Sequence, residues 1–223
     1  MVHHANAVLV DTTEEILTVR GTKSHRLDAC GGVMQNAAGV GKGVAHGIRP
    51  TMPRPYWYCP CCGTALTRQG LHGRERLVCP ACQFIFWQNP VVGVAVIVMQ
   101  EEHIVLARRA RGIYQGAWCI PCGYVEYDED VRHAAQREFQ EETGLLVEVD
   151  EVYAVHSNFH NPASHSVGIW FRGTVRSGTL RPDDDVDQVA YMSLHHLPDN
   201  VAFPTDRLVL AQLQRDVLHK CSS

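Results

Sequence analysis

Residues 123–145 read GYVEYDEDVRHAAQREFQEETGL. Asp128 and Asp130 occupy positions that suit a helix N-cap and a first-turn acid. Gly144 suits the other end, because glycine adopts left-handed backbone angles at a helix C-cap without steric cost. The pattern therefore predicts a helix from about Glu129 to Thr143.

Three glutamates lie near the end of this predicted helix. Residues three or four positions apart share a helix face, so we expect Glu138, Glu141 and Glu142 on one side. The C-terminal end of a helix carries partial negative charge, which disfavours carboxylates there. A hard divalent cation such as Mg²⁺ or Mn²⁺, bound through oxygen ligands, would offset this repulsion. The alternative is a solvated acidic face on an amphipathic helix.

The fixed positions of this stretch resemble the Nudix box. The matching residues are Gly123, Glu129, Arg137, Glu138, Glu141, Glu142 and Gly144, with apolar Phe139 and Leu145 in place. The resemblance implies a Nudix hydrolase, an enzyme that cleaves a diphosphate linked to another moiety. It also implies an α+β fold, an α/β/α sandwich around a mixed sheet.

The same resemblance implies roles for individual side chains. Glu138 and Glu142 would be the principal metal ligands, and Glu141 would assist as a further ligand or as a base. Arg137 would pair with Glu129 and orient the cluster. The general base often lies outside the box in this family. The candidates here are Glu141, Glu126 and the acids of segment 183–187.

The turn before the box departs from the family pattern. Many members carry Pro-Gly-Gly there, whereas this chain has Pro121-Cys122-Gly123. Gly123 would allow a backbone turn that brings its carbonyl near the metal. Cys122 tolerates only ordinary backbone angles, so the loop is expected to differ slightly, with a catalytic thiol as the alternative role. Cys119 is expected to be buried.

Two CxxC pairs precede this region. Cys59 and Cys62 are separated from Cys79 and Cys82 by sixteen residues, a spacing typical of zinc sites. Four thiolates would form a closed structural Zn²⁺ site, with Cys61 as a spectator. We expect a zinc ribbon over residues 56–90, with strands near 75–78 and 84–87. The alternatives are two disulfides or a thiol redox motif. Binding of nucleic acid by the ribbon is weakly supported, because its arginines are scattered and form no strong basic cluster.

The rest of the chain predicts a Nudix domain over residues 91–223. The run VVGVAVIVM at 91–99 is apolar and β-branched, which is typical of a buried central strand. Further elements are expected as strands over 103–108, 117–121, 146–155, 167–175 and 186–192, and as an amphipathic helix over 205–218. Residues 1–55 are expected to form a weakly ordered tail, unless translation begins at Met52.

The composition of the chain limits the classes of protein to which it can belong. The chain has 223 residues, 45% of them hydrophobic, and a net charge of −4, which is ordinary for a soluble protein and gives no support for nucleic-acid binding. No apolar run is long enough to span a bilayer, and no signal peptide is seen. Nine clustered cysteines argue against a secreted disulfide framework and favour a cytoplasmic location.

A zinc ribbon before a Nudix domain resembles two groups within the family, NADH pyrophosphatases and a smaller group acting on ADP-ribose or FAD. The SQPWPFPxS-like stretch of the first group is absent after residue 145, and VAFPT at 201–205 looks more like the second. ADP-ribose or FAD, cleaved to AMP, is therefore the favoured small-molecule substrate. NAD(H) comes second and nucleoside triphosphates third. A non-catalytic ligand sensor is the other class, and the resemblance leaves a homodimer open.

Three histidines flank an expected substrate loop, with an ordinary surface or core position as the default interpretation, and three aromatic residues are candidates for stacking on a substrate. The histidines are His156, His160 and His165, and the aromatic residues are Tyr153, Phe159 and Trp170. The aromatic rings could stack on an adenine or an isoalloxazine ring, or they could belong to the core.

Overall fold

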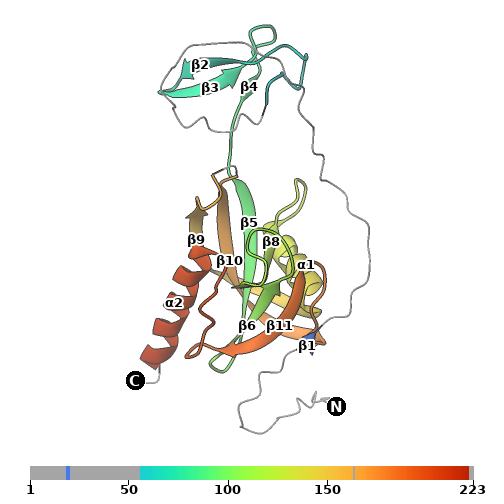
Figure 1. Cartoon of the computed structure of the whole chain (residues 1–223), viewed down its shortest axis with the longest axis vertical. Helices are drawn as coiled ribbons and strands as arrows, with labels where there is room; N and C mark the ends of the chain where they lie inside the picture. Colours follow the sequence, from blue (N-terminus) through green and yellow to red (C-terminus); the bar gives the residue numbers. More distant parts are fainter. Residues whose placement is uncertain (1–18, 21–55, 163, 221–223) are drawn as a thin grey trace, which may run out of the picture. The chain divides into compact units, whose positions relative to one another are not determined.

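The computed structural model describes residues 19–20, 56–162 and 164–220. The chain divides into two compact units (Figure 1). The larger unit contains residues 92–156 and the described residues from 168 onward, together with strand β1 (Val19–Arg20). The smaller unit contains the described residues from 56 to 91 and 157–167. Apart from the two residues of β1, the expected tail lies outside the described residues, as does the alternative start at Met52.

A sheet with the strand order β1-β11-β6-β5-β10-β9 forms the larger unit (Figure 1). Its long strands are β5 (Val91–Gln100), β6 (His103–Arg109), β9 (Leu145–Asn158), β10 (Ser166–Gly178) and β11 (Val186–Ser193). The strands predicted over these segments are confirmed, and each is somewhat longer than expected. Strand β5 is internal to the sheet and is buried from Val94 to Val98, as its β-branched sequence indicated.

Two short strands carry the turn that precedes the box. Strand β7 (Trp118–Cys119) pairs with β6, and β8 (Cys122–Tyr124) pairs with β5. The strand predicted over 117–121 was too long, because Pro121 has no backbone N–H to donate to a neighbouring strand. The Pro121 carbonyl instead accepts a 3.2 Å hydrogen bond from the Val96 N–H. The turn at 121–123 therefore lies beside the central strand.

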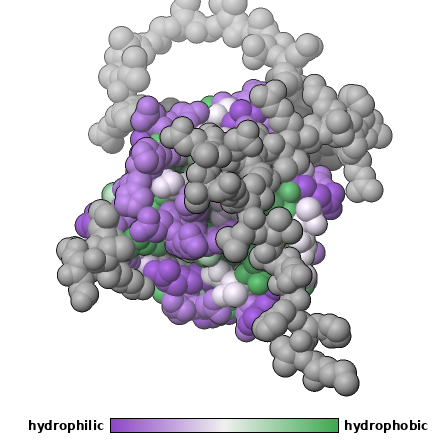
Figure 2. All heavy atoms as spheres, turned by 90° about the horizontal axis from the view of Figure 1, so that it is seen from below, coloured by the Kyte–Doolittle hydropathy of each residue, from purple (hydrophilic) through white to green (hydrophobic). Residues whose placement is uncertain are grey.

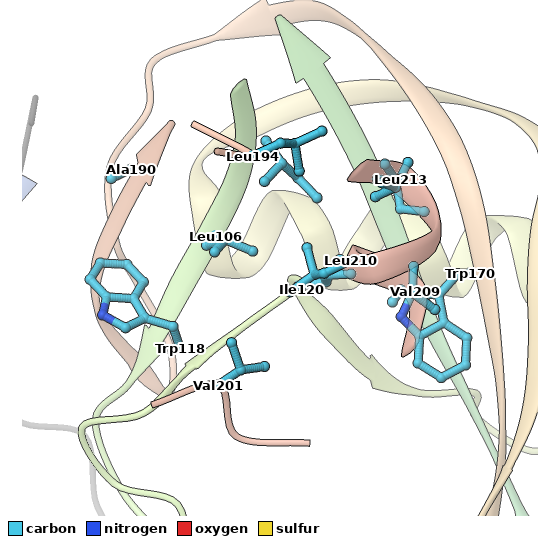
Figure 3. Packing of buried hydrophobic residues seen from close by; sticks show 13 residues of the cluster. Leu106, Trp118, Ile120, Trp170, Ala190, Leu194, Val201, Val209, Leu210 and Leu213 are labelled. Carbon is cyan, nitrogen blue, oxygen red and sulfur yellow. The ribbon is translucent and has the colours of Figure 1, made fainter. Parts of the chain in front are cut away.

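Two apolar clusters flank the sheet, each closed by one helix. Successive side chains of a strand point to opposite faces, so Val94, Val96 and Val98 pack toward Phe139 of α1 (Val131–Thr143). The intervening residues of β5 join the cluster of α2 (Pro204–Lys220). Figure 3 shows this second cluster, which contains Leu106, Ile120, Trp170, Val209, Leu210 and Leu213. The predicted layering of helix, sheet and helix is confirmed.

Helix α1 begins two residues later than predicted. The side chain of Asp130 accepts a 2.8 Å hydrogen bond from the Arg132 N–H, which makes Asp130 the N-cap. Gly144 ends the helix in the left-handed conformation, with φ of 72°, and its N–H donates to the Gln140 carbonyl. Glu129 thus lies before the first turn rather than within it.

The smaller unit contains a three-stranded antiparallel sheet, β2-β3-β4. Its strands are β2 (Thr67–Leu71), β3 (Arg74–Val78) and β4 (Ile85–Phe86). The two predicted strands correspond to β3 and β4. Strand β2 was not predicted, because TRQGL is mostly exposed and lacks a β-branched run.

The face of the molecule in Figure 2 is mainly hydrophilic, with scattered apolar residues. Among the described residues, none of the helices has the length and apolarity that a membrane span requires.

Candidate active site

Glu142 is the most deeply buried acid of the box, with 2% of its surface exposed. Its Oε2 accepts a 2.9 Å hydrogen bond from the backbone N–H of Cys122. Burial raises the pKa of Glu142 well above its ordinary value, and the neighbouring Cys122 and Asp185 raise it further. An ionised carboxylate in this position needs a compensating cation.

Glu138 lies against the backbone of Gly123. A Cβ atom placed on Gly123 would lie 2.0 Å from Cδ of Glu138 and within 2.4 Å of both carboxylate oxygens. Gly123 is not among the described glycines with positive φ, so close approach, and not an unusual turn conformation, requires glycine here. Burial raises the pKa of Glu138, and Arg137 opposes that shift.

Arg137 holds the carboxylates at the exposed end of the site. Its guanidinium donates to both oxygens of Glu129, at 2.8 and 2.9 Å, as the sequence led us to expect. The same group donates to Glu138 at 2.8 Å and to Glu141 at 3.1 Å. Hydrogen bonding to Arg137 lowers the pKa of Glu129. The network places Glu138 and Glu141 side by side.

The three box glutamates converge less closely than predicted. In the part of the chain that the structure describes, the only set of three or more metal-ligating atoms within 4.8 Å of one another is a cysteine quartet. Glu138 and Glu141 are drawn toward Arg137, whereas Glu142 points inward to Cys122. Carboxylates repel one another. The Arg137 guanidinium holds Glu138 and Glu141, and the Cys122 amide holds Glu142 apart from them.

The acidic loop between β10 and β11 contributes further carboxylates. Asp185 forms a 3.1 Å ion pair with Arg109 and raises the pKa of the neighbouring Glu142. Asp184 acts on Glu138 through its charge. Among the candidate bases, Glu141 and Asp185 lie beside the box acids. At Glu126, the backbone N–H donates to Oε2 of Glu129 at 3.4 Å.

A polar pocket of about 550 Å³ adjoins the box. It is lined by His133, Gln136, Arg137, Gln140, Glu141, Arg181 and Asp183. The sequence analysis missed four of these residues, His133, Gln136, Gln140 and Arg181. The helical spacing of the first three, which share the outer face of α1, could have revealed them. Such a lining suits a ligand that carries hydroxyl or phosphate groups.

The four cysteines of the CxxC pairs form a compact quartet. The Sγ atoms are 3.5 Å apart for Cys59 and Cys82, 3.4 Å for Cys62 and Cys79, and 3.6 Å for Cys62 and Cys82. A tetrahedral Zn²⁺ with bonds of about 2.3 Å holds sulfurs at roughly these separations. Contact with the Thr64 hydroxyl lowers the pKa of Cys62 to about 6. At Cys82 the Phe84 backbone lowers the pKa, but Cys59 and Cys79 outweigh it and raise the pKa to about 12, so a bound cation would be needed to keep all four as thiolates.

The described cysteines are all free, so the two disulfides considered from the sequence are not formed. Cys61 is exposed and lies outside the quartet, as expected. Cys119 is buried, also as expected, and its Sγ lies 3.6 Å from the Ala107 carbonyl oxygen.

Comparison with known proteins identifies the family. The NUDIX domain family matches residues 89–213, more than half of the chain. The chain belongs to the Nudix hydrolase family. Over 128 residues it is 30% identical to the ADP-ribose pyrophosphatase of Methanocaldococcus jannaschii, an alignment that covers 57% of this chain and 75% of that protein.

Two further relatives extend this comparison. The chain is 25% identical over 142 residues to the NAD-capped RNA hydrolase NudC of Stutzerimonas stutzeri, covering 63% of this chain but only about half, 49%, of that protein. The crystal structure of a NUDIX hydrolase from Nitrosomonas europaea superposes with a TM-score of 0.65 at 29% identity. That match covers 75% of this chain and 94% of the other.

The box residues of this Nudix hydrolase fit the divalent cation that the family generally uses. The donors are carboxylate oxygens, the ligand type that Mg²⁺ and Mn²⁺ prefer. Glu142 is an inward-facing acid that gains from a cation, and Gly123 leaves room for the Glu138 carboxylate.

The aromatic residues and histidines differ in their burial and partners. Trp170 is buried and donates from Nε1 to Asp206 at 3.1 Å, and the Tyr153 hydroxyl donates to Asp216 at 2.6 Å. The His156 ring packs on the edge of Trp170. Phe159, His160 and His165 fall in the smaller unit, where the Phe159 and His165 rings meet edge to face. The core interpretation therefore holds for Trp170.

Proposed function

We propose that this Nudix hydrolase is a divalent-metal-dependent pyrophosphatase that cleaves a nucleoside diphosphate linked to another moiety and releases AMP. ADP-ribose is the favoured substrate. The observation that carries the proposal is that the turn before the box meets two box acids: the Cys122 amide fixes the buried Glu142, and Gly123 leaves the space that the Glu138 carboxylate fills. The similarity to an archaeal ADP-ribose pyrophosphatase supports the choice of substrate.

In this proposal Glu138 and Glu142 hold Mg²⁺ or Mn²⁺, and Glu141 assists. When bound, the cation would neutralise phosphoryl oxygens and lower the pKa of a coordinated water. Glu141 is half-exposed at the edge of the polar pocket, which supports a role in accepting a proton from the attacking water. Arg137 and Glu129 keep the neighbouring carboxylates in position.

The polar pocket would receive the sugar and phosphate groups of the substrate. Gln136 and Gln140 offer amide donors and acceptors, and Arg181 offers a guanidinium that suits phosphate. This polar lining supports a nucleotide sugar as substrate over an apolar ligand.

A second candidate substrate is NAD(H), and the similarity to NudC, named as an NAD-capped RNA hydrolase, supports it. FAD requires the same cleavage chemistry and belongs in the same test. We further propose that residues 56–90 form a zinc ribbon, with one structural Zn²⁺ on Cys59, Cys62, Cys79 and Cys82, before a Nudix domain at 91–223.

The test is release of AMP from ADP-ribose, FAD, NADH and ATP in the presence of Mg²⁺ or Mn²⁺, with EDTA as the control. We expect ADP-ribose to give the highest kcat/KM and EDTA to abolish turnover. Glu142→Gln should lower kcat by roughly 100-fold or more while the protein stays folded. Tight binding of one compound without turnover of any would instead identify a ligand sensor.

A further inference from the structure

Three ion pairs join the end of β6 and the residues just after it to the acidic loop before β11 and to the start of β11. The pairs are Arg108–Asp187 at 2.8 Å, Arg109–Asp185 at 3.1 Å and Arg111–Asp184 at 3.4 Å. The side chains of Arg109 and Asp185 are only 19% and 22% exposed, whereas those of the other two pairs are between 32% and 67% exposed. The middle pair is therefore the one that solvent screens least.

Both partners of this pair are anchored by the backbone. Arg109 is paired with Val186 in the sheet, and the Ala110 N–H donates to the Asp185 carbonyl at 2.8 Å. The ring of Phe203, just before α2, lies 5.5 Å from the Arg109 guanidinium and covers it. The guanidinium therefore has little freedom to leave Asp185.

Asp185 links this pair to the box. Asp185 raises the pKa of the neighbouring Glu142, and the Asp183 N–H donates to the Glu142 carbonyl at 3.3 Å. Two neighbouring carboxylates repel each other when both are ionised. Arg109 is the cation that faces them, since its charge interacts with both Asp185 and Glu142. Burial opposes the charge on Arg109, but these acids outweigh burial and raise its pKa.

We propose that Arg109 is a positioning residue of this Nudix hydrolase, which acts through Asp185 to fix the orientation of the Glu142 carboxylate. An ion pair joins the Arg109 guanidinium to Asp185, the charge of Asp185 acts on Glu142, and a hydrogen bond joins Glu142 to the Cys122 amide. Neither Arg109 nor Asp185 belongs to the box. The inference rests on the proposed function, because it assigns Glu142 to the divalent cation.

The experiment compares Arg109→Met with Arg108→Met. Arg108 is a matched control, because it is the adjacent arginine and pairs with a nearby aspartate, Asp187 at the start of β11, in a more exposed setting. Three quantities are measured: kcat and KM for the best substrate, and the Kd for Mn²⁺ from an electron paramagnetic resonance titration without substrate. The titration reports on the site independently of turnover.

Arg109→Met should lower kcat and weaken Mn²⁺ binding by roughly 10- to 100-fold each, with KM changed less than about threefold. Arg108→Met should stay within about threefold of the wild type in all three quantities. Arg109→Lys should recover part of the loss, because lysine keeps the charge but not the planar fork. Asp185→Asn should add little to Arg109→Met, since the two act in one chain of contacts.

Equal losses in the two arginine variants, or wild-type kcat and Mn²⁺ affinity in Arg109→Met, would overturn the inference. If Arg109→Met does not fold, as judged by thermal unfolding, the comparison uses Arg109→Lys and Asp185→Asn against Asp187→Asn. A wild-type protein that turns over none of the four nucleotides would overturn the proposed function, and the Mn²⁺ titration would still decide the role of Arg109.

Discussion

The backbone N–H of Cys122 and Oε2 of Glu142, twenty positions apart in the chain, are joined by a 2.9 Å hydrogen bond. This bond fastens the turn before the box to the last turn of α1. The main chain makes it, so the cysteine side chain is not needed for it. The hydrogen bond with the Cys119 thiol, together with burial, raises the pKa of Cys122 well above its ordinary value. A thiol in that state is a poor nucleophile.

Cys122→Gly should therefore retain turnover within about threefold of the wild type, because the amide donor to Glu142 remains. The measurement is kcat and KM with the best substrate of the panel, and Cys122→Ser provides a variant that keeps the side-chain volume. A loss of two orders of magnitude in both variants would establish the catalytic thiol that the sequence left open.

The contacts at the exposed end of the site, around Arg137, could be predicted from the sequence because the residues lie close together in the chain. The pairing of Arg137 with Glu129 spans eight positions, and the shared neighbourhood of Glu138 and Glu141 follows from helical spacing. The cap at Gly144 followed from its backbone preference. The helix start was placed two residues early, because Asp128, Glu129 and Asp130 offered adjacent capping candidates and only the structure shows which side chain accepts the hydrogen bond.

The contacts around the buried Glu142 and Asp185 could not be predicted in the same way, because they join residues far apart in the chain. Asp185 reaches Arg109 across 76 positions, a contact that depends on strand register and not on spacing. The orientation of the Glu142 side chain toward the Cys122 amide depends on where the turn at Cys122 lies in the sheet. Sequence patterns report the period of a helix or strand, but they do not report which loop meets which strand end.

Gly123 should be intolerant of any side chain because of Glu138. In Gly123→Ala the new Cβ would lie 2.0 Å from Cδ of Glu138, so the carboxylate must move. That carboxylate is the far end of a flexible side chain, so the fold should survive while kcat falls by roughly 100-fold. Gly93→Ala is the control, since a Cβ there would lie 3.5 Å from the Gly123 carbonyl oxygen, an ordinary contact.

The two glycine variants are compared by thermal unfolding and by kcat. We expect similar unfolding midpoints and a loss of turnover in Gly123→Ala alone. Full activity in Gly123→Ala would mean that the observed position of Glu138 is not the one used in catalysis.

The cysteine quartet should hold one Zn²⁺ per chain. Cys79 is fully buried within it, so Cys79→Ser should abolish zinc retention and expose residues 56–90 to proteolysis, because so small a unit depends on its metal for folding. Cys61→Ser should retain both zinc and protease resistance, since Cys61 is exposed and outside the quartet. Elemental analysis and limited proteolysis measure the two properties. Zinc-free wild-type protein purified under reducing conditions would contradict the zinc assignment.

Asp206 links three elements of the larger unit. It is 1% exposed in the first turn of α2 and accepts hydrogen bonds from the Ile120 N–H at 3.0 Å and from Trp170 Nε1 at 3.1 Å. Burial raises its pKa to about 7, although both hydrogen bonds oppose the shift. In the unfolded chain the same carboxyl titrates near pH 4. Between these values the folded state binds more protons than the unfolded state.

The free energy of unfolding contributed by Asp206 should therefore be greatest below about pH 4 and should fall as the pH rises toward 7. Asp206→Asn cannot ionise, so it removes this dependence, although it also loses one acceptor for Ile120 or Trp170. Denaturant unfolding of both proteins at pH 5, 6, 7 and 8 measures the difference, and other titrating groups cancel in it. Relative to the variant, the wild type should lose roughly 1.4 kcal/mol per pH unit between pH 5 and 6 and level off above pH 7. A wild type that gains stability over the variant as the pH rises would show that the hydrogen bonds from Ile120 and Trp170 outweigh burial.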